Sequence, residues 1–484
     1  MNRLIQLECA SLSRARARVV VLLIALVIAI ASSGIAAASG QLANQPTSEY
    51  RARRQKLMEQ IKDGIIVLIG AQEDDFGEVG RFRQKNDFMY LTGVETPAAS
   101  LILVPAGLIP DKGAQEIVFI PPRNLLQERW TGAQIGPGPE AEQKFGVQEV
   151  VSADRFYSRL IDLLTGPPFR TDNPRSRLPA KLYTIVPRGS TAQLTRESQF
   201  VDTIKRIAPY VQVIDVAPII AEMRKIKSTS EVELLQKAID ITTEAQREAC
   251  KAIKPGAYEY EVQAALEAAF TRNGAERPGF PSIVGSGFNS TILHYNSNRK
   301  KIEAGDLIVV DIGAEYSYYT ADITRTYPAS GKFTPRQREI YQLVLDAQRA
   351  AERAFKPGQT TMNQLKQVVI DFIKASPLRD KQGNTLERYF IHGLGHWLGM
   401  DVHDVGDYSK PIPAGSVITI EPGIYIPEES LGVRIEDDYL VTEIGLIKMS
   451  GKIPSDTDEI ERLMSSNSEM VPNNTSAPRR DKKE

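Results

Sequence analysis

The residues best suited to chemistry in this chain are its histidines and a set of acids in apolar surroundings. There are only four histidines among 484 residues, and three of them fall in one stretch, HGLGHWLGMDVHDVG (392–406). Strand-like runs on either side carry acids: Asp311 in LIVVDIG, Asp322 in TADITRT, Glu421 in ITIEPGIY and Glu436 in VRIEDD. An acid among β-branched residues is costly to bury unless another group pairs with it. Four such acids beside imidazoles predict a divalent-metal site and, with it, metal-dependent hydrolysis.

The ligand types indicate which ions such a site would hold. Four converging carboxylates without cations would repel one another too strongly for all of them to stay ionised. Two divalent ions remove this difficulty, and at ~3.5–4 Å apart they can share a hydroxide and polarise a carbonyl. A set rich in oxygen with a single imidazole favours manganese, leaves cobalt, iron and zinc open, and argues against copper. We therefore predict two divalent ions, with manganese as the first choice.

Each of these residues also has a purely structural interpretation. An isolated acid in a strand is usually an edge or surface group, and for Asp311 alone the two interpretations are equally good. His392 could be a satisfied core histidine, and His403 and His294 could be ordinary hydrogen-bonding residues. Arg434 could hold ligand carboxylates in place or touch a substrate. The repeated positions of the acids beside a histidine cluster favour the catalytic interpretation of the set.

An internal repeat places two of the acids at equivalent positions. The hexapeptide KAIKPG at 251–256 recurs as RAFKPG at 353–358, and each leads into a predicted helix. Six residues, Ile302, Ala304, Gly305, Ile308, Asp311 and Gly313, have counterparts 110 positions later in Ile412, Ala414, Gly415, Ile418, Glu421 and Gly423. We expect a second acid on the returning strand of each hairpin, Asp322 after Asp311 and Glu436 after Glu421. A duplicated unit related by a pseudo-two-fold axis would bring the acids of both halves together.

The remaining pattern predicts two domains. Apolar runs at 64–70, 100–105, 116–122, 181–187 and 211–216 are typical of strands in a mixed α/β sheet. A new segment starts near 223–228, where Ser228 and Glu231 form a predicted capping box for a helix over 229–253. Two further helices are expected, one ending near Gly274 and one beginning at Thr334-Pro335. We therefore predict an α/β domain at 39–222 and an α+β domain with the internal repeat at 223–464.

The ends of the chain predict export and a disordered tail. Arginines at positions 3, 14, 16 and 18 precede the apolar run 19–31, and three alanines at 36–38 offer a cleavage site, so residues 1–38 are typical of a signal peptide. The apolar run is short for a membrane span. We expect a periplasmic or secreted protein with no stable membrane insertion after cleavage, and an uncleaved membrane anchor is the alternative. The polar segment 465–484 is typical of a disordered tail.

The net charge argues against nucleic-acid and membrane partners, and the cysteine content argues against a disulfide. The net charge of −1 gives no reason to expect nucleic acid or an anionic membrane surface as a partner. Cys9 lies in the predicted signal peptide, which leaves Cys250 as the one cysteine of the mature chain. An intrachain disulfide is therefore excluded, and stability must come from packing.

Several blocks of sequence carry a family resemblance. They are IVGSGFNSTILHY (283–295), VVDIGAEYSYYTADITRTYP (309–328), HGLGHWLGMDVHDVG (392–406) and ITIEPGIYIPEESLGVRIEDD (418–438). Together they resemble the pita-bread metallopeptidases and, among these, Xaa-Pro aminopeptidase, also called aminopeptidase P. RFRQKNDFMYLTG (81–93) and ERWTG (128–132) are more loosely similar to that family's amino-terminal domain. The resemblance implies a pita-bread catalytic domain that removes the first residue from peptides with proline in second position.

The resemblance also implies which residues hold the metals. Asp311 and Asp322 would bind one ion and His396 the other, while Glu421 and Glu436 would complete the pair. Glu421 would, in addition, take a proton from a water bridging the two ions.

Further roles follow from the same resemblance. His294 and His403 would hydrogen-bond the scissile carbonyl and the developing oxyanion, which requires donors fixed in advance. His392 would line the pocket for proline, and Tyr425 and Arg434 would support the metal shell. The resemblance implies a homo-oligomer, a dimer or a tetramer, in which Asp87 and Trp130 reach a neighbouring subunit's active site.

Two departures from the family pattern keep rivals open. The connection from 405–406 to Glu421 is short and lacks an arginine that some aminopeptidases P carry, and the segment from Glu421 to Arg434 is also short. Both features bring the chain nearer to prolidases, which cut only dipeptides with carboxy-terminal proline. The large first domain and ERWTG favour the aminopeptidase, and the same domain with the export signal argues against a methionine aminopeptidase. A catalytically inactive binding module with the same fold is the non-enzyme alternative.

Overall fold

The computed structural model describes residues 45–73, 82–109, 112–165, 181–188 and 195–468. The predicted signal peptide and most of the predicted tail lie outside these ranges, although helix α13 (Thr457–Ser468) covers the first residues assigned to the tail. Within the described ranges, no helix combines the length and the apolar character needed to cross a bilayer.

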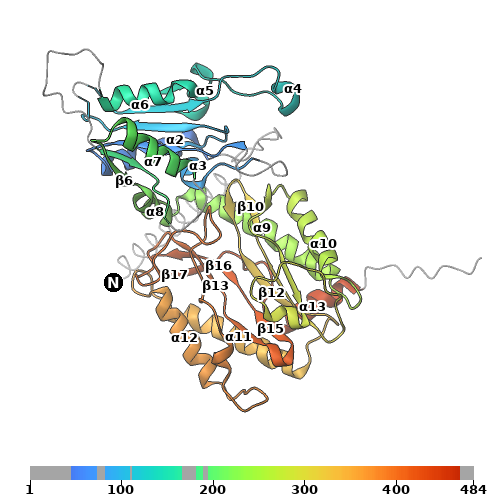
Figure 1. Ribbon diagram of the computed structural model, residues 1–484. Helices are drawn as coiled ribbons and strands as arrows, with labels where there is room; N and C mark the ends of the chain where they lie inside the picture. The colour runs from blue at the N-terminus through green and yellow to red at the C-terminus, as the bar shows by residue number, and fades with distance from the viewer. Residues whose placement is uncertain (1–44, 74–81, 110–111, 166–180, 189–194, 469–484) are drawn as a thin grey trace, which may run out of the picture. The chain divides into compact units, whose positions relative to one another are not determined.

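The amino-terminal domain is built on a six-stranded mixed sheet (Figure 1). In spatial order its strands are β4 (Glu149–Ser152), β3 (Gln115–Ile120), β2 (Ser100–Val104), β1 (Ile65–Ile69), β5 (Lys181–Thr184) and β6 (Gln212–Asp215). The pairs β1–β2 and β2–β3 are antiparallel, and the other three pairs are parallel. The five strands predicted from apolar runs are confirmed. Strand β4 was not predicted, because its four residues, EVVS, are too few to show an apolar pattern.

Helices pack on this sheet and bury its apolar side chains. They are α2 (Thr47–Gln60), α6 (Phe156–Thr165) and α7 (Arg196–Ile207), with the shorter α3 (Asn86–Thr92), α4 (Glu128–Thr131) and α5 (Pro139–Phe145) at the strand connections. Phe156 on α6 and Phe200 on α7 meet over the sheet with ring centroids 6.0 Å apart. Helix α8 (Ala217–Lys225) then leads to the second domain.

The first half of the second domain consists of two helices and a three-stranded sheet. Helices α9 (Thr229–Ala252) and α10 (Glu259–Arg272) precede the sheet of β12 (Ile323–Pro328), β9 (Leu307–Ile312) and β8 (Ile283–Ser286). The short strands β7 (Arg277–Pro278), β10 (Ala314–Tyr316) and β11 (Tyr319–Thr320) form a second small sheet. The predicted capping box of Ser228 and Glu231 is confirmed at the start of α9.

The second half repeats this order. Helices α11 (Pro335–Ala354) and α12 (Met362–Ala375) precede a sheet of β13 (Val417–Ile420), β16 (Asp437–Thr442) and β17 (Gly445–Lys448) and the hairpin of β14 (Gly423–Ile426) and β15 (Leu431–Arg434). Thr334 and Gln337 form the predicted capping box of α11. As Figure 1 shows, α9 and α10 lie beside the strands of the first half, and α11 and α12 beside those of the second. One hydrophobic core joins both halves, which confirms the predicted α+β domain with a duplicated unit.

Candidate metal centre and active site

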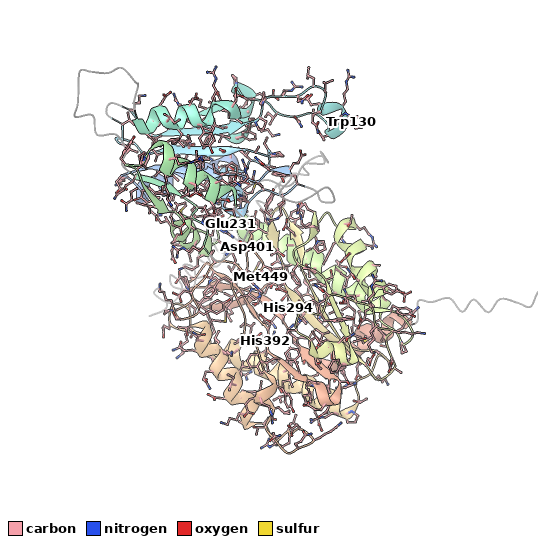
Figure 2. All side chains as sticks on the ribbon, viewed as in Figure 1. Trp130, Glu231, His294, His392, Asp401 and Met449 are labelled. Carbon is pink, nitrogen blue, oxygen red and sulfur yellow. The ribbon has the colours of Figure 1, made fainter. Side chains whose placement is uncertain are left out.

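A cavity of about 520 Å³ is lined by residues from both halves of the second domain. All five predicted metal ligands line it, namely Asp311, Asp322, His396, Glu421 and Glu436, together with His294, His392, His403 and Arg434. Figure 2 labels His294 and His392, which lie near each other inside this domain. Residues that are far apart in the sequence therefore converge on one site, as the repeat predicts.

The four acids reach the cavity mainly from strand ends. Asp311 lies within β9, whereas Asp322 immediately precedes β12, Glu421 follows β13, and Glu436 lies between β15 and β16. Only Asp311 therefore lies inside a strand, and the other three acids lie at strand ends. Successive side chains within a strand point to opposite faces of the sheet. A residue at a strand end does not have to follow this alternation, so two acids of one hairpin can face the same cavity.

The second acids of the two halves do not occupy equivalent positions. Asp311 pairs with Thr324 across the first hairpin. In the second half, Ile420 pairs with Asp437 and Gly423 with Arg434, which places Glu421 opposite Glu436. Glu436 therefore corresponds to Thr324, and Asp322 lies two residues before that position. The repeat predicted the first acid of each half correctly, but the second acid is specific to each half.

Two glutamines, which the sequence analysis missed, hold the ligand strands. Gln246 on α9 donates to the carbonyls of Val310 and Ile323, at 3.1 and 2.7 Å. Gln348 on α11 donates to the carbonyls of Ile420 and Ile435, at 3.0 and 3.4 Å. Each carbonyl belongs to the residue just before Asp311, Thr324, Glu421 or Glu436. The repeated tripeptide Ala-Gln-Arg at 245–247 and 347–349 is the sequence signal that could have identified them.

His396 is oriented as a metal ligand. Its Nδ1–H donates to the Trp397 carbonyl at 3.0 Å, which turns Nε2 towards the acids. From Nε2 the nearest oxygens of Asp322, Glu421 and Glu436 are 3.4, 3.6 and 3.9 Å away. Ligand atoms of Asp322, His396 and Glu436 all lie within 4.8 Å of one another, a spacing that one cation can bridge.

The acids themselves show that a cation fits. Among the described residues, Asp311 Oδ1, Asp322 Oδ1 and Glu436 Oε1 are buried without a hydrogen-bond partner. Burial and then the neighbouring acids raise the pKa of Asp322 and of Glu436 well above the usual range. Burial also raises the pKa of Glu421 to about 7, although His396 and Arg434 oppose the shift. Positive charge placed among these oxygens would satisfy them and let the carboxylates ionise.

Arg434 hydrogen-bonds a ligand carboxylate, which favours the first of its two interpretations. Its Nη2 donates to Asp311 Oδ2 at 2.7 Å, and its Nε donates to Thr324 Oγ1 at 3.2 Å. The Thr324 hydroxyl in turn donates to Glu436 Oε2 at 2.7 Å. The guanidinium is buried, so it aligns one acid directly and another through Thr324. Thr324 is a further site residue that the sequence analysis missed.

His392 belongs to the same network and is neutral. Its Nδ1–H donates to the Gly393 carbonyl at 2.7 Å, so Nε2 accepts from the Tyr425 hydroxyl at 2.9 Å. That hydroxyl accepts from Arg434 Nη1 at 2.9 Å. Burial and the nearby Arg434 lower the pKa of His392 to about 3. His392 is thus satisfied by hydrogen bonds and also lines the cavity, so its two interpretations hold together.

His403 and His294 face the cavity from two different loops. The rings of His403 and His396 meet edge to face with centroids 4.5 Å apart. Burial, followed by the proximity of His396 and His294, lowers the pKa of His403. A neutral imidazole retains one N–H donor, which is what stabilisation of a developing oxyanion requires.

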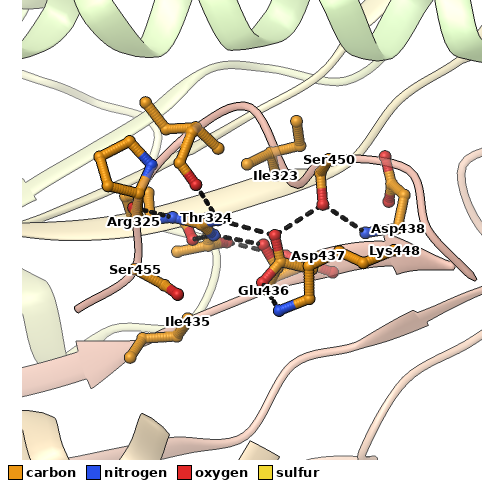
Figure 3. Close-up of polar contacts among 12 residues, drawn as sticks. Ile323, Thr324, Arg325, Ile435, Glu436, Asp437, Asp438, Lys448, Ser450 and Ser455 are labelled. Atoms are coloured by element: carbon orange, nitrogen blue, oxygen red, sulfur yellow. Dashed lines mark hydrogen bonds and ion pairs between the residues drawn. The ribbon is translucent and has the colours of Figure 1, made fainter. Parts of the chain in front are cut away.

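A buried ion pair, that of Arg325 and Asp437, lies beside Thr324 and Glu436, as Figure 3 shows. Arg325 on β12 donates to Asp437 Oδ1 at 2.7 Å and to the Glu436 carbonyl at 2.7 Å. Asp437 also accepts from Ser450 at 2.6 Å and from Lys448 at 3.1 Å. Arg325 follows Thr324, and Asp437 follows Glu436. The pair therefore fixes the two halves to each other one residue away from the site.

Asp87 and Trp130 do not line this cavity. Asp87 Oδ1 lies 2.7 Å from Nη1 of Arg224, which also pairs with Asp401 and Asp404 at 2.6 Å each. Trp130 on α4 is 87% exposed. Their predicted contact with a neighbouring subunit concerns an assembly and stays a prediction.

The raised acid pKa values predict how metal-free protein responds to pH. An acid whose pKa is higher in the folded than in the unfolded state stabilises the fold at low pH. For Glu421 this contribution is complete below about pH 4.5 and is lost as the pH rises through about 7. We expect the melting temperature of chelator-treated protein to fall by several degrees between pH 5 and pH 8. Added manganese should raise it more at pH 8, because ions and protons compete for the same oxygens. Thermal melts at both pH values check this, and an equal effect of manganese at both would contradict it.

Comparison with known proteins agrees with this geometry. Residues 233–443 match the model of metallopeptidase family M24, and residues 50–169 match that of the aminopeptidase P N-terminal domain. The Xaa-Pro aminopeptidase of Escherichia coli (strain K12) is 34% identical over 440 residues, covering 86% of this chain and 97% of that protein. The chain belongs to the Xaa-Pro aminopeptidase family of M24 metallopeptidases. It is therefore a metal-dependent exopeptidase by family, which disfavours the inactive binding module.

Two further relatives, an aminopeptidase P and a Xaa-Pro dipeptidase, differ in how much of this chain they match. The structure of aminopeptidase P from E. coli with the inhibitor Pro-Leu superimposes with a TM-score of 0.76 at 32% identity, covering 88% of this chain and all of that one. A Xaa-Pro dipeptidase from Pyrococcus furiosus is 38% identical over 276 residues, but that match covers 56% of this chain. The likeness to aminopeptidase P thus extends over both domains of this family member.

Proposed function

We propose that this chain is an exported aminopeptidase with two divalent metal ions, most favourably manganese, that hydrolyses the bond between the first residue of a peptide and proline in second position. The observation that carries the proposal is the convergence of five ligand side chains with three unsatisfied buried oxygens. The relative with the Pro-Leu inhibitor supports the substrate class. When bound, such ions activate water and polarise the scissile carbonyl.

Glu421 serves as the general base in this proposal. Its carboxylate lines the cavity and lies 3.6 Å from His396 Nε2 and 3.7 Å from His392 Nδ1. There it takes a proton from the attacking water and delivers it to the proline nitrogen that leaves. The nitrogen of an Xaa-Pro bond is tertiary and cannot break away without this proton.

The other cavity residues bind and orient the substrate. His403 and His294 donate hydrogen bonds to the scissile carbonyl as its oxygen gains negative charge. The apolar side chains of Phe280, Ile283 and Leu293 line the same cavity as His392. Together they offer a wall for the proline ring, and neutral His392 adds no buried charge to it.

The length of the accepted substrate distinguishes the proposed aminopeptidase from the rival prolidase. We expect hydrolysis of Xaa-Pro-Yaa tripeptides and of longer Xaa-Pro peptides by purified mature protein loaded with manganese. Peptides with alanine in second position serve as the control and should be poor substrates. Hydrolysis of Xaa-Pro dipeptides alone would show that the chain is a prolidase.

Replacing His403 with alanine should separate catalysis from metal binding. Loss of one oxyanion donor lowers kcat by about 10²–10³-fold. The metal content should stay at the wild-type value, because His396 and the four acids remain. Steady-state kinetics and elemental analysis of the same preparation check both points. A His403→Ala protein that has lost its metal would identify this residue as a ligand instead.

The proposed assembly is a homo-oligomer, a dimer or a tetramer, in which Trp130 reaches a neighbouring active site. The support is the 87% exposure of Trp130, beside the exposed Leu125 and Leu126. Trp130→Ala should then raise KM for a peptide substrate, with His403, Glu421 and the metals untouched. A monomeric protein in solution, or a Trp130→Ala variant with wild-type KM, would rule the shared site out.

Export is proposed from residues 1–38, which lie outside the described part of the chain. The expected mature protein begins after Ala38 and is found in the periplasmic or secreted fraction. Mass spectrometry of the native protein tests this, and a retained apolar run would indicate the membrane-anchored alternative.

A further inference from the structure

We propose that Glu259 is the positioning residue for His294, an inference that rests on the proposed function. Glu259 is the first residue of α10, and its side chain is fully buried. Among the described residues, no lysine, arginine or histidine forms an ion pair with it. A buried carboxylate without a cation must be satisfied by hydrogen-bond donors.

Those donors all come from one loop, residues 286–300. Oε1 accepts from the Ser286 N–H at 2.8 Å, the Ser286 hydroxyl at 2.8 Å and Asn289 Nδ2 at 3.1 Å. Oε2 accepts from the Tyr295 hydroxyl and from the Lys300 N–H, both at 2.8 Å. The carboxylate thus ties the start, the middle and the end of the loop to one point. Hydrogen bonds to a charged acceptor are stronger than neutral ones, which suits an anchor that holds several points of one long loop.

This loop carries His294 into the cavity. His294 lies next to Tyr295, whose hydroxyl is one of the five donors, and both Leu293 and His294 line the cavity. No hydrogen bond within the described residues holds the His294 ring itself. Its place therefore depends on the backbone of the loop, and a shift of the loop would move the imidazole away from the scissile carbonyl.

The anchor requires a carboxylate, not merely a side chain of the same shape. The Ser286 and Lys300 N–H groups are backbone groups that can only donate, and they face different oxygens of Glu259. In Glu259→Gln one of them would meet the amide NH₂ whichever way the amide is turned. One buried donor would lose its acceptor and the loop would shift.

A double-mutant cycle tests this assignment. Glu259→Gln, His294→Ala and the double variant are compared with wild type, all loaded with manganese, by kcat and KM on an Xaa-Pro-Yaa peptide. Glu261→Gln is the matched control, because it makes the same change two residues later in an exposed side chain whose capping contact glutamine preserves. Metal content and melting temperature are measured for each protein.

We expect Glu259→Gln to lower kcat by about 10–100-fold with wild-type metal content, as for residues that orient a functional side chain. In the His294→Ala background the same change should alter kcat by less than about threefold. A multiplicative loss in the double variant, or full activity of Glu259→Gln, would overturn the assignment. If Glu259→Gln does not fold, Tyr295→Phe takes its place in the cycle with a smaller expected loss and the same outcomes. Wild-type activity in His294→Ala would instead refute the proposed role of His294, and with it the need for an anchor.

Discussion

Turnover should disappear when Glu421 is replaced by alanine, with a fall in kcat of at least about 10³-fold. Two functions are lost together, because this carboxylate is both a ligand candidate near His396 and the proposed base. Retention of metal should weaken as well, since one of four acids is gone. Steady-state kinetics and elemental analysis measure the two losses.

Glu428→Ala is the matched control for this change. Glu428 is exposed and lies seven residues further along the same segment, away from the cavity lining. It should keep wild-type turnover and metal content. Near-normal turnover in Glu421→Ala would remove Glu421 from the site.

The largest expected effect on stability is that of Arg325→Met. This change leaves Asp437 buried with Lys448 as its remaining charged partner, and removal of one partner of a buried pair destabilises by about 3–5 kcal/mol. The carbonyls of Thr324, Glu436, Ile453 and Pro454 also lose a hydrogen bond from this guanidinium. Urea denaturation of wild type and variant measures the change in the free energy of unfolding.

Arg338→Met controls for loss of an arginine as such. Arg338 is half-exposed and pairs with Asp458 and Glu461 near the surface, where such pairs contribute about 0–1 kcal/mol. If Arg325→Met were as stable as Arg338→Met, the ion pair of Figure 3 would not join the two halves. A companion Asp437→Asn variant should lose less in the Arg325→Met background than alone, because the two residues act on each other.

Much of the architecture could be predicted because it rests on local signals. The capping boxes at Ser228 and Thr334 need only a hydroxyl and an acid or amide three residues later, so sequence shows them directly. The apolar runs of the first sheet are visible for the same reason. The convergence of Asp311 and Glu421 on one cavity was predictable from the repeat, because the two acids occupy equivalent positions in its two halves.

The parts that escaped prediction depend on strand register and on side-chain partners. Thr324 and Asp322 differ by two residues, and only the pairing of β9 with β12 shows which of them faces Asp311. The role of Gln246 depends on which carbonyls of β9 and β12 lie within its reach. Glu259 looks like an ordinary first-turn acid in the sequence. Its loop partners, up to 41 residues away, are brought to it only by the fold.

The family resemblance predicted roles for more site residues than the sequence pattern alone did. The structure adds the distances and hydrogen bonds between these residues. Arg434 shows the difference: in the sequence it could hold ligands or touch substrate, and its bonds to Asp311 and Thr324 now favour the first. The short segment from Glu421 to Arg434, which brings the chain nearer to prolidases, forms the tight hairpin of β14 and β15. Substrate length therefore has to be measured and does not follow from the metal ligands, which both kinds of enzyme share.

The central claim is that five side chains of the two halves hold a pair of cations. Elemental analysis of the purified mature protein tests it most directly, with activity followed during chelation and manganese return. We predict about two divalent ions per chain, loss of activity when they are removed, and recovery when manganese is restored. A protein that retains no stoichiometric divalent ion, yet keeps hydrolysing Xaa-Pro peptides after exhaustive chelation, would contradict the account.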